Sequence, residues 1–156
     1  MLRYIGSRKP RLSLGLILAA ILCCVVVVRP AYGADNPAEG KKAAESAMLA
    51  WLGEIDAGAY AKSWDDASSF FRKAVTSEGW QQQINAVRGP LGRCSSRVIA
   101  SARYSENTPG LHGVASVMVQ FKSSFDGLAY AVETVTFVKD GADGWRSAGY
   151  YIKPGP

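Results

Sequence analysis

The chain has 156 residues, with 18 Lys and Arg against 13 Asp and Glu, and its formal net charge is +5. Five of the basic residues and none of the acidic ones precede Ala34, so the part from Ala34 onward has 13 of each and is neutral. Its basic residues are scattered and form no long run, which argues against a nucleic-acid-binding protein.

The first 33 residues have the pattern of a secretory signal peptide. A basic segment is followed by 17 uncharged residues from Leu12 to Val28. Arg29-Pro30 and the small-x-small sequence Ala31-Tyr32-Gly33 come next, as at a cleavage site. The sequence therefore predicts an exported protein, periplasmic or secreted.

An uncleaved membrane anchor is the alternative interpretation of the same segment. The apolar run is longer than the ~7–15 residues usual in a signal peptide and reaches the lower limit of ~17 residues for a membrane span. Two of the three cysteines, Cys23 and Cys24, lie in this run. Cleavage would leave Cys94 alone, so we expect no intramolecular disulfide.

Helices are expected first in the remaining chain. Residues 34–43 form a polar lead, in which Asn36-Pro37 suits a helix start, and residues 44–153 form a single domain. Apolar residues at helical spacing predict a helix that Gly58 ends, a shorter helix from Tyr60 and a further apolar cluster over residues 70–75. Thr76 or Ser77 can cap another helix, which residues 89–92 break. The apolar residues of the first and last of these helices are Ala44, Ala47, Met48, Trp51, Leu52, Ile55, Trp80, Ile84 and Val87.

Strands are expected after Gly92, where the period of the apolar residues becomes two. Val98, Ala100, Ala102 and Tyr104 alternate with polar residues that include Arg97, Ser101 and Arg103. Three more strands are predicted over residues 115–121, 127–138 and 145–152, with turns at residues 107–110 and 140–144. Helices followed by an antiparallel meander predict an α+β fold with a curved four-stranded sheet packed on the N-terminal helices.

Several short motifs, in this order, resemble one family. They are Trp51-Leu52, Asp56 to Tyr60, Ser63-Trp64, Ala67-Ser68, Phe71-Arg72, Trp80, Arg88 to Gly92, Arg97, Glu133 to Thr136, Gly144 to Arg146 and Gly149-Tyr150. The chain resembles domain-of-unknown-function family 4019, a group of small exported bacterial proteins, from about Ala44 to Lys153. The resemblance implies a cystatin-like or nuclear-transport-factor-two-like α+β roll. It implies no activity and no site residues.

The aromatic residues are the candidate ligand-binding residues. Trp51, Trp64 and Trp80 could line a cavity between the helices and the sheet, where such rolls often hold a pocket. Core packing is the favoured interpretation, because each tryptophan lies on the apolar side of its helix. The full candidate set for a ligand is Tyr60, Trp64, Trp80, Arg88 and Tyr150.

Glu133 is the candidate catalytic residue, because it lies in an otherwise apolar strand. A carboxylate that faces a dry cavity could act as a general base, with Tyr60 or Tyr150 as a donor, in an isomerase or dehydratase. The favoured alternative is a structural salt bridge to Arg88, Arg97 or Arg103.

A thiol or metal site is not expected. Cys94 and His112 are the one Cys and the one His after Ala34, and nothing in their spacing brings them together. One of each cannot make a zinc site, and the aspartates lack calcium-loop spacing. No phosphate loop or dinucleotide fingerprint occurs, so no cofactor is expected either.

These observations favour a non-enzymatic exported domain that binds a small apolar molecule or an envelope protein. The enzyme based on Glu133 is the second hypothesis. A homodimeric scaffold, joined through the open face of the sheet, is the third.

The signal peptide gives the first testable prediction. N-terminal sequencing of the protein recovered from outside the cytoplasm is expected to begin at Ala34, since cleavage after Gly33 suits the small-x-small rule. A membrane-bound protein that still begins at Met1 would instead establish the uncleaved anchor.

Overall fold

The computed structural model describes residues 36–110 and 113–156, all within one compact unit, Tyr32–Pro156. The predicted signal peptide, its alternative as an anchor, and His112 lie outside the described residues. Within the described residues, no helix is long and apolar enough to cross a membrane.

Four α-helices come first. They are α1 (Pro37–Asp56), α2 (Tyr60–Asp65), α3 (Ser69–Ala74) and α4 (Ser77–Arg88), and a short 3-10 turn, η1 (Gly89–Leu91), follows. The predicted helix start is confirmed, because Asn36 caps α1 by accepting a hydrogen bond from Ala38 N at 3.0 Å. Residues 37–43 of the predicted lead therefore form the first turns of α1. Thr76, not Ser77, caps α4.

The sheet follows as a meander. Strands β1 (Cys94–Ser105), β2 (Ser116–Phe125), β3 (Leu128–Lys139) and β4 (Trp145–Pro154) pair antiparallel in the order β1-β2-β3-β4, and the turn η2 (Gly141–Asp143) joins the last two. The predicted α+β class, with helices on a curved four-stranded antiparallel sheet, is confirmed. The more specific cystatin-like or nuclear-transport-factor-two-like roll stays a prediction.

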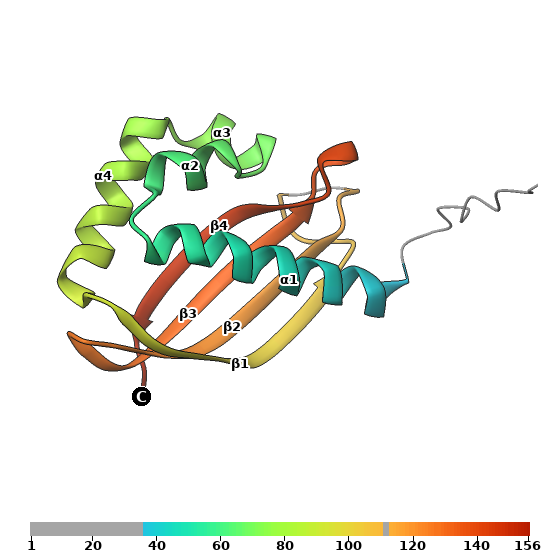
Figure 1. The fold of residues 1–156 in the computed structure, drawn as a ribbon. Coiled ribbons are helices and arrows are strands. Elements are labelled where there is room, and N and C mark those ends of the chain that lie inside the picture. Colours follow the sequence, from blue (N-terminus) through green and yellow to red (C-terminus); the bar gives the residue numbers. More distant parts are fainter. Residues whose placement is uncertain (1–35, 111–112) are drawn as a thin grey trace, which may run out of the picture. The chain divides into compact units, whose positions relative to one another are not determined.

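Helices α1 to α4 lie on one face of the sheet (Figure 1). Helix α1 crosses this inner face, with α2, α3 and α4 grouped over the β4 side. The core fills the space between the two layers with residues from every strand except β1 and from α1 and α4. Its buried members are Ala44, Met48, Trp51, Leu52, Ile55, Trp80, Ile84, Val117, Val119, Phe121, Val135, Phe137 and Trp145. No helix within the described residues lies on the opposite face of the sheet.

A β-bulge in β1 corrects one prediction. Simple alternation along β1 predicts that Val98 lies on the same face as Tyr104 and that Arg97 lies on the polar face. The pairing with β2 shifts register between Ile99 and Ser101, and Val98 is 64% exposed. An extra residue reverses the parity of a strand, so the residues before the bulge change face. Arg97 consequently points toward the helices together with Tyr104.

Candidate functional site

Glu133 lies at the centre of the inner face of the sheet. It sits in β3 between Phe121 of β2 and Ile152 of β4, and its side chain has no exposed surface. A buried carboxylate is stable only where charged or polar partners replace water. The surroundings of Glu133 therefore decide what it can do.

Four side chains donate hydrogen bonds to Glu133. Arg97 binds both carboxylate oxygens, from Nε to Oε2 at 2.6 Å and from Nη2 to Oε1 at 3.2 Å. Tyr150 donates its hydroxyl to Oε1 at 2.7 Å, and Arg88 Nη1 lies 3.3 Å from the same oxygen. Ser123 donates to Oε2. Both oxygens of Glu133 are thus occupied.

Asp56 completes the cluster from the last residue of α1. Arg88 Nη2 donates to Asp56 Oδ1 at 2.7 Å, and Arg97 Nη1 donates to Oδ2 at 2.6 Å. A carboxylate at a helix C-terminus is unfavourable beside the negative end of the helix dipole, and the last turn of α1 has no basic residue. The two arginines supply the compensating charge. We call Asp56, Arg88, Arg97 and Glu133, with Tyr150 and Ser123, the buried charge cluster.

Elements distant in the sequence meet at this cluster. Arg88 ends α4, Arg97 belongs to β1, and their partners come from α1 and β3. The Arg88 guanidinium also lies 4.4 Å from the centre of the Phe125 ring, a cation–π distance, while its Nε has no hydrogen-bond partner. With Ser123 of β2 and Tyr150 of β4 included, the cluster joins the ends of two helices to all four strands.

The pKa shifts of Asp56, Arg97 and Tyr150 are those expected when Asp56, Glu133 and both arginines are charged. Burial alone would raise the pKa of Asp56, but the hydrogen bonds and charge of Arg97, with those of Arg88, hold it below its ordinary value. Burial would likewise lower the pKa of Arg97, yet its bonds to Asp56 and Glu133 raise it. Burial and the charge of Glu133 raise the pKa of Tyr150, so its hydroxyl keeps the proton that it donates.

This geometry favours the structural interpretation of Glu133 over the catalytic one. A general base needs a lone pair within reach of a substrate proton. The two oxygens of Glu133 instead accept bonds from two guanidinium groups, a hydroxyl and a phenol, and water does not reach them. Of the three arginines considered as partners, Arg88 and Arg97 bind, whereas Arg103 lies on the opposite face of the sheet.

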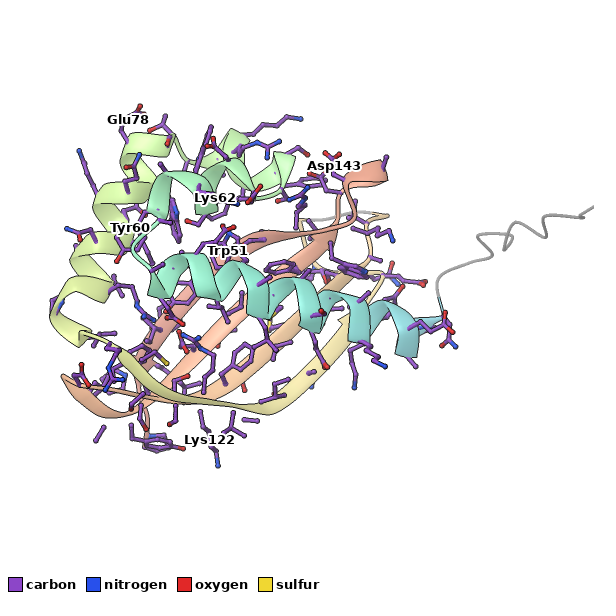
Figure 2. All side chains as sticks on the ribbon, viewed as in Figure 1. Trp51, Tyr60, Lys62, Glu78, Lys122 and Asp143 are labelled. Carbon is purple, nitrogen blue, oxygen red and sulfur yellow. The ribbon has the colours of Figure 1, made fainter. Side chains whose placement is uncertain are left out.

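The tryptophans pack in the core, as favoured from the sequence. Trp51 and Trp80 are 3% and 5% exposed and stack with ring centroids 6.1 Å apart, and Trp64 packs against this core. Figure 2 shows Trp51 on the side of α1 that faces the sheet. Each indole N–H has a partner: Trp51 and Trp80 donate to Ser63 O and Oγ, and Trp64 donates to Val75 O. Tyr60 also packs against the core.

Cys94 does not form a nucleophile site in the described structure. It begins β1, at the opposite end of the strand from the loop that leads toward His112. Its Sγ lies 3.4 Å from Ser96 O, and burial raises the pKa of the thiol, which disfavours the thiolate. No group of three or more His, Cys, Asp or Glu that could hold a metal ion occurs among residues 36–110 and 113–156.

The described residues form a hollow and a groove on the surface. A hollow of about 340 Å³ opens on the outer face of the sheet, against the end of β1 and the loop after it. A groove of about 150 Å³ lies between α4 and β4, lined by Trp80, Gln83, Ile84, Val87, Tyr150, Tyr151 and Ile152. The groove contains two of the predicted ligand-binding residues, Trp80 and Tyr150. The hollow contains none of them.

Sequence reasoning missed several members of these sites. Asp56 could have been noticed, because it lies at the predicted end of a helix, just before Gly58. A basic residue is usual there, so an acidic one needs a positively charged partner. Ser123 and the residues of the hollow gave none, because their roles depend on cross-strand pairing. Tyr60, Trp64 and Trp80 do not join the buried charge cluster, whereas Arg88 and Tyr150 do.

The comparisons with known proteins agree with the resemblance in the sequence. Residues 47–150 match the family described as protein of unknown function (DUF4019). The chain belongs to the DUF4019 family. This match covers α1 from its middle through the first half of β4 and so includes every residue of the buried charge cluster. A search of curated proteins finds no match to this DUF4019 chain.

The second testable prediction concerns the buried charge cluster. Glu133→Gln is expected to lower the free energy of unfolding by about 3–5 kcal/mol, because it leaves two arginines with a single carboxylate. Glu78→Gln, at an exposed position in the first turn of α4, should cost less than about 1 kcal/mol. Urea unfolding of the two variants measures both values. Equal losses would show that Glu133 does not hold the cluster together.

Proposed function

We propose that the protein is an exported binding domain that receives an extended segment of an envelope protein at the edge of β4. Export is supported by the pattern of the first 33 residues. A binding role is supported by the engagement of Glu133, the one candidate catalytic residue, in structural salt bridges. The observation that carries the proposal is the half-covered edge of β4 beside an apolar groove.

The edge of β4 is covered in its first half. Ser68 N, at the start of α3, donates to Ser147 O at 2.8 Å, and Arg146 binds Asp66. Beyond this point, no helical segment within the described part of the chain makes a backbone hydrogen bond with Gly149 to Lys153. An exposed strand edge offers N–H and C=O groups to another strand.

The groove lies beside this second half of the edge. Ile84 and Val87 of α4 face Tyr151 and Ile152 of β4 across it, and Val87 is 44% exposed. An added strand would hydrogen-bond to β4 and place alternate side chains against α4. Helix α4 thus provides apolar contacts that β4 alone would lack.

The size of the groove favours a protein segment over a small apolar molecule. Pockets for small molecules usually enclose ~300–1,000 Å³, and the groove has about 150 Å³. That volume suits a single apolar side chain. Peptide recognition by strand addition needs no more, since the main chain supplies most of the hydrogen bonds.

The homodimeric scaffold is less favoured in its original form. That hypothesis requires two copies to meet through the outer face of the sheet. Arg103, Lys122 and Lys153 lie on that face, so two copies would bring like charges together. A dimer through the β4 edge is a separate outcome, which the following experiment detects.

The third testable prediction uses a photo-crosslinking amino acid at Gln83, which lines the groove. In the full chain expressed with its own N-terminus in its natural host, ultraviolet light should join this position to one stretch of one envelope protein. The matched control is the same amino acid at Gln82, which is exposed on α4 but does not line the groove. Val87→Glu, an exposed change, should abolish the adduct because it places a charge in the groove.

Mass spectrometry of the adducts decides between the outcomes. A single partner segment that is joined at Gln83, absent at Gln82 and lost with Val87→Glu supports the proposal. Adducts between two copies of the chain would replace it with a homodimer. No adduct, or the same adducts at both positions, would overturn it.

A further inference from the structure

The outer face of the sheet carries positive charge that no carboxylate among residues 36–110 and 113–156 is seen to pair with. Arg103 of β1, Lys122 of β2 and Lys153 of β4 are exposed there. Across the four described strands the one acidic residue is Glu133, which faces the helices. Figure 2 shows Lys122 on the side of the sheet away from α1. The outer face therefore attracts anions.

The hollow of about 340 Å³ places one of these cations in a concave site. Three adjacent strands contribute to its base, with Arg103 opposite Met118 and Met118 opposite Thr136. Asn107 and Thr108, in the loop after β1, form part of its wall. Thr108 and Ser116 share a hydrogen bond that fixes this wall against β2.

The donors around the hollow suit an oxyanion with neighbouring hydroxyl groups. Arg103 has no carboxylate partner among the residues that the structure describes, so its guanidinium fork is available. Ser101 Oγ lies 3.5 Å from Gln120 Oε1, an arrangement that leaves the amide N–H groups of Gln120 free to donate. Met118, 43% exposed, provides an apolar surface between these polar groups.

We propose that this hollow binds a small hydroxylated molecule that carries a carboxylate or phosphate group, with Arg103 as its counter-ion. The volume of the hollow falls within the range of ~300–1,000 Å³ that is usual for small-molecule sites. Glu106 is the acidic residue nearest to Arg103 along the chain. Its carboxylate accepts a hydrogen bond from the hydroxyl of Tyr104, and the Tyr104 ring contacts Trp145 of the core. The site is separate from the groove at β4 and does not depend on the proposed protein partner.

The fourth testable prediction is a titration of the exported protein, followed by amide chemical shifts. The probes are glucuronate, glucose 6-phosphate and glucose, which share a sugar ring and differ in their charged group. Either anion should cause saturable shifts at Ser101, Met118 and Gln120, and added salt should weaken the binding. Glucose should cause none there. The anion that binds with the higher affinity shows whether the site prefers a carboxylate or a phosphate.

Two exposed variants provide the control. Arg103→Gln should weaken anion binding about 10–100-fold, because it removes a charged hydrogen-bond donor. Arg93→Gln makes the same exchange at an exposed arginine outside the hollow and should leave binding unchanged. The proposal is overturned if neither anion gives saturable shifts in the hollow, if glucose binds as well, or if both variants weaken binding equally.

Discussion

The fold depends on the pairing of two arginines with two carboxylates between the helices and the sheet. Removal of each charge from water costs several kcal/mol, and pairing with good geometry is what offsets this cost. Arg88, Arg97, Asp56 and Glu133 come from four different elements, so each is stable only while the other three are in place. A one-residue slip of β3 would move Glu133 to the outer face and leave both arginines without it. The cluster therefore fixes the positions of the helices and strands relative to one another more than it adds to the free energy of unfolding.

The two surfaces proposed as binding sites are shaped by the same constraint. Because the single carboxylate of the four strands points inward, the strands offer no carboxylate on the outer face to balance Arg103, Lys122 and Lys153. Because Arg88 anchors the end of α4 over the sheet, the apolar side of α4 stands next to the edge of β4 and forms the groove there. The two proposed binding sites lie on these two surfaces.

Local sequence patterns predict the helices and strands. The face on which a residue lies and the surface sites depend on pairing between distant segments. The change of apolar period from helical spacing to two identified the helices and strands, and the cap at Asn36 followed from its neighbour Pro37. The pairing of Glu133 with Arg88 and Arg97 was also among the expectations, because a carboxylate in an apolar strand needs a partner. The face of Arg97 could not be predicted, since the bulge near Ala100 is visible only in the register with β2. The hollow and the free half of the β4 edge depend likewise on contacts between distant segments.

A double-mutant cycle on Arg97 and Glu133 tests the central claim most directly. The free energies of unfolding of Arg97→Gln, Glu133→Gln and the double variant would be measured in urea. If the two side chains support each other, the double variant loses less than the sum of the single losses, by at least about 1 kcal/mol. The combination of Arg97→Gln with Glu78→Gln, which share no contact, should be additive. Losses at Arg97 and Glu133 that add to within about 0.5 kcal/mol would contradict the account.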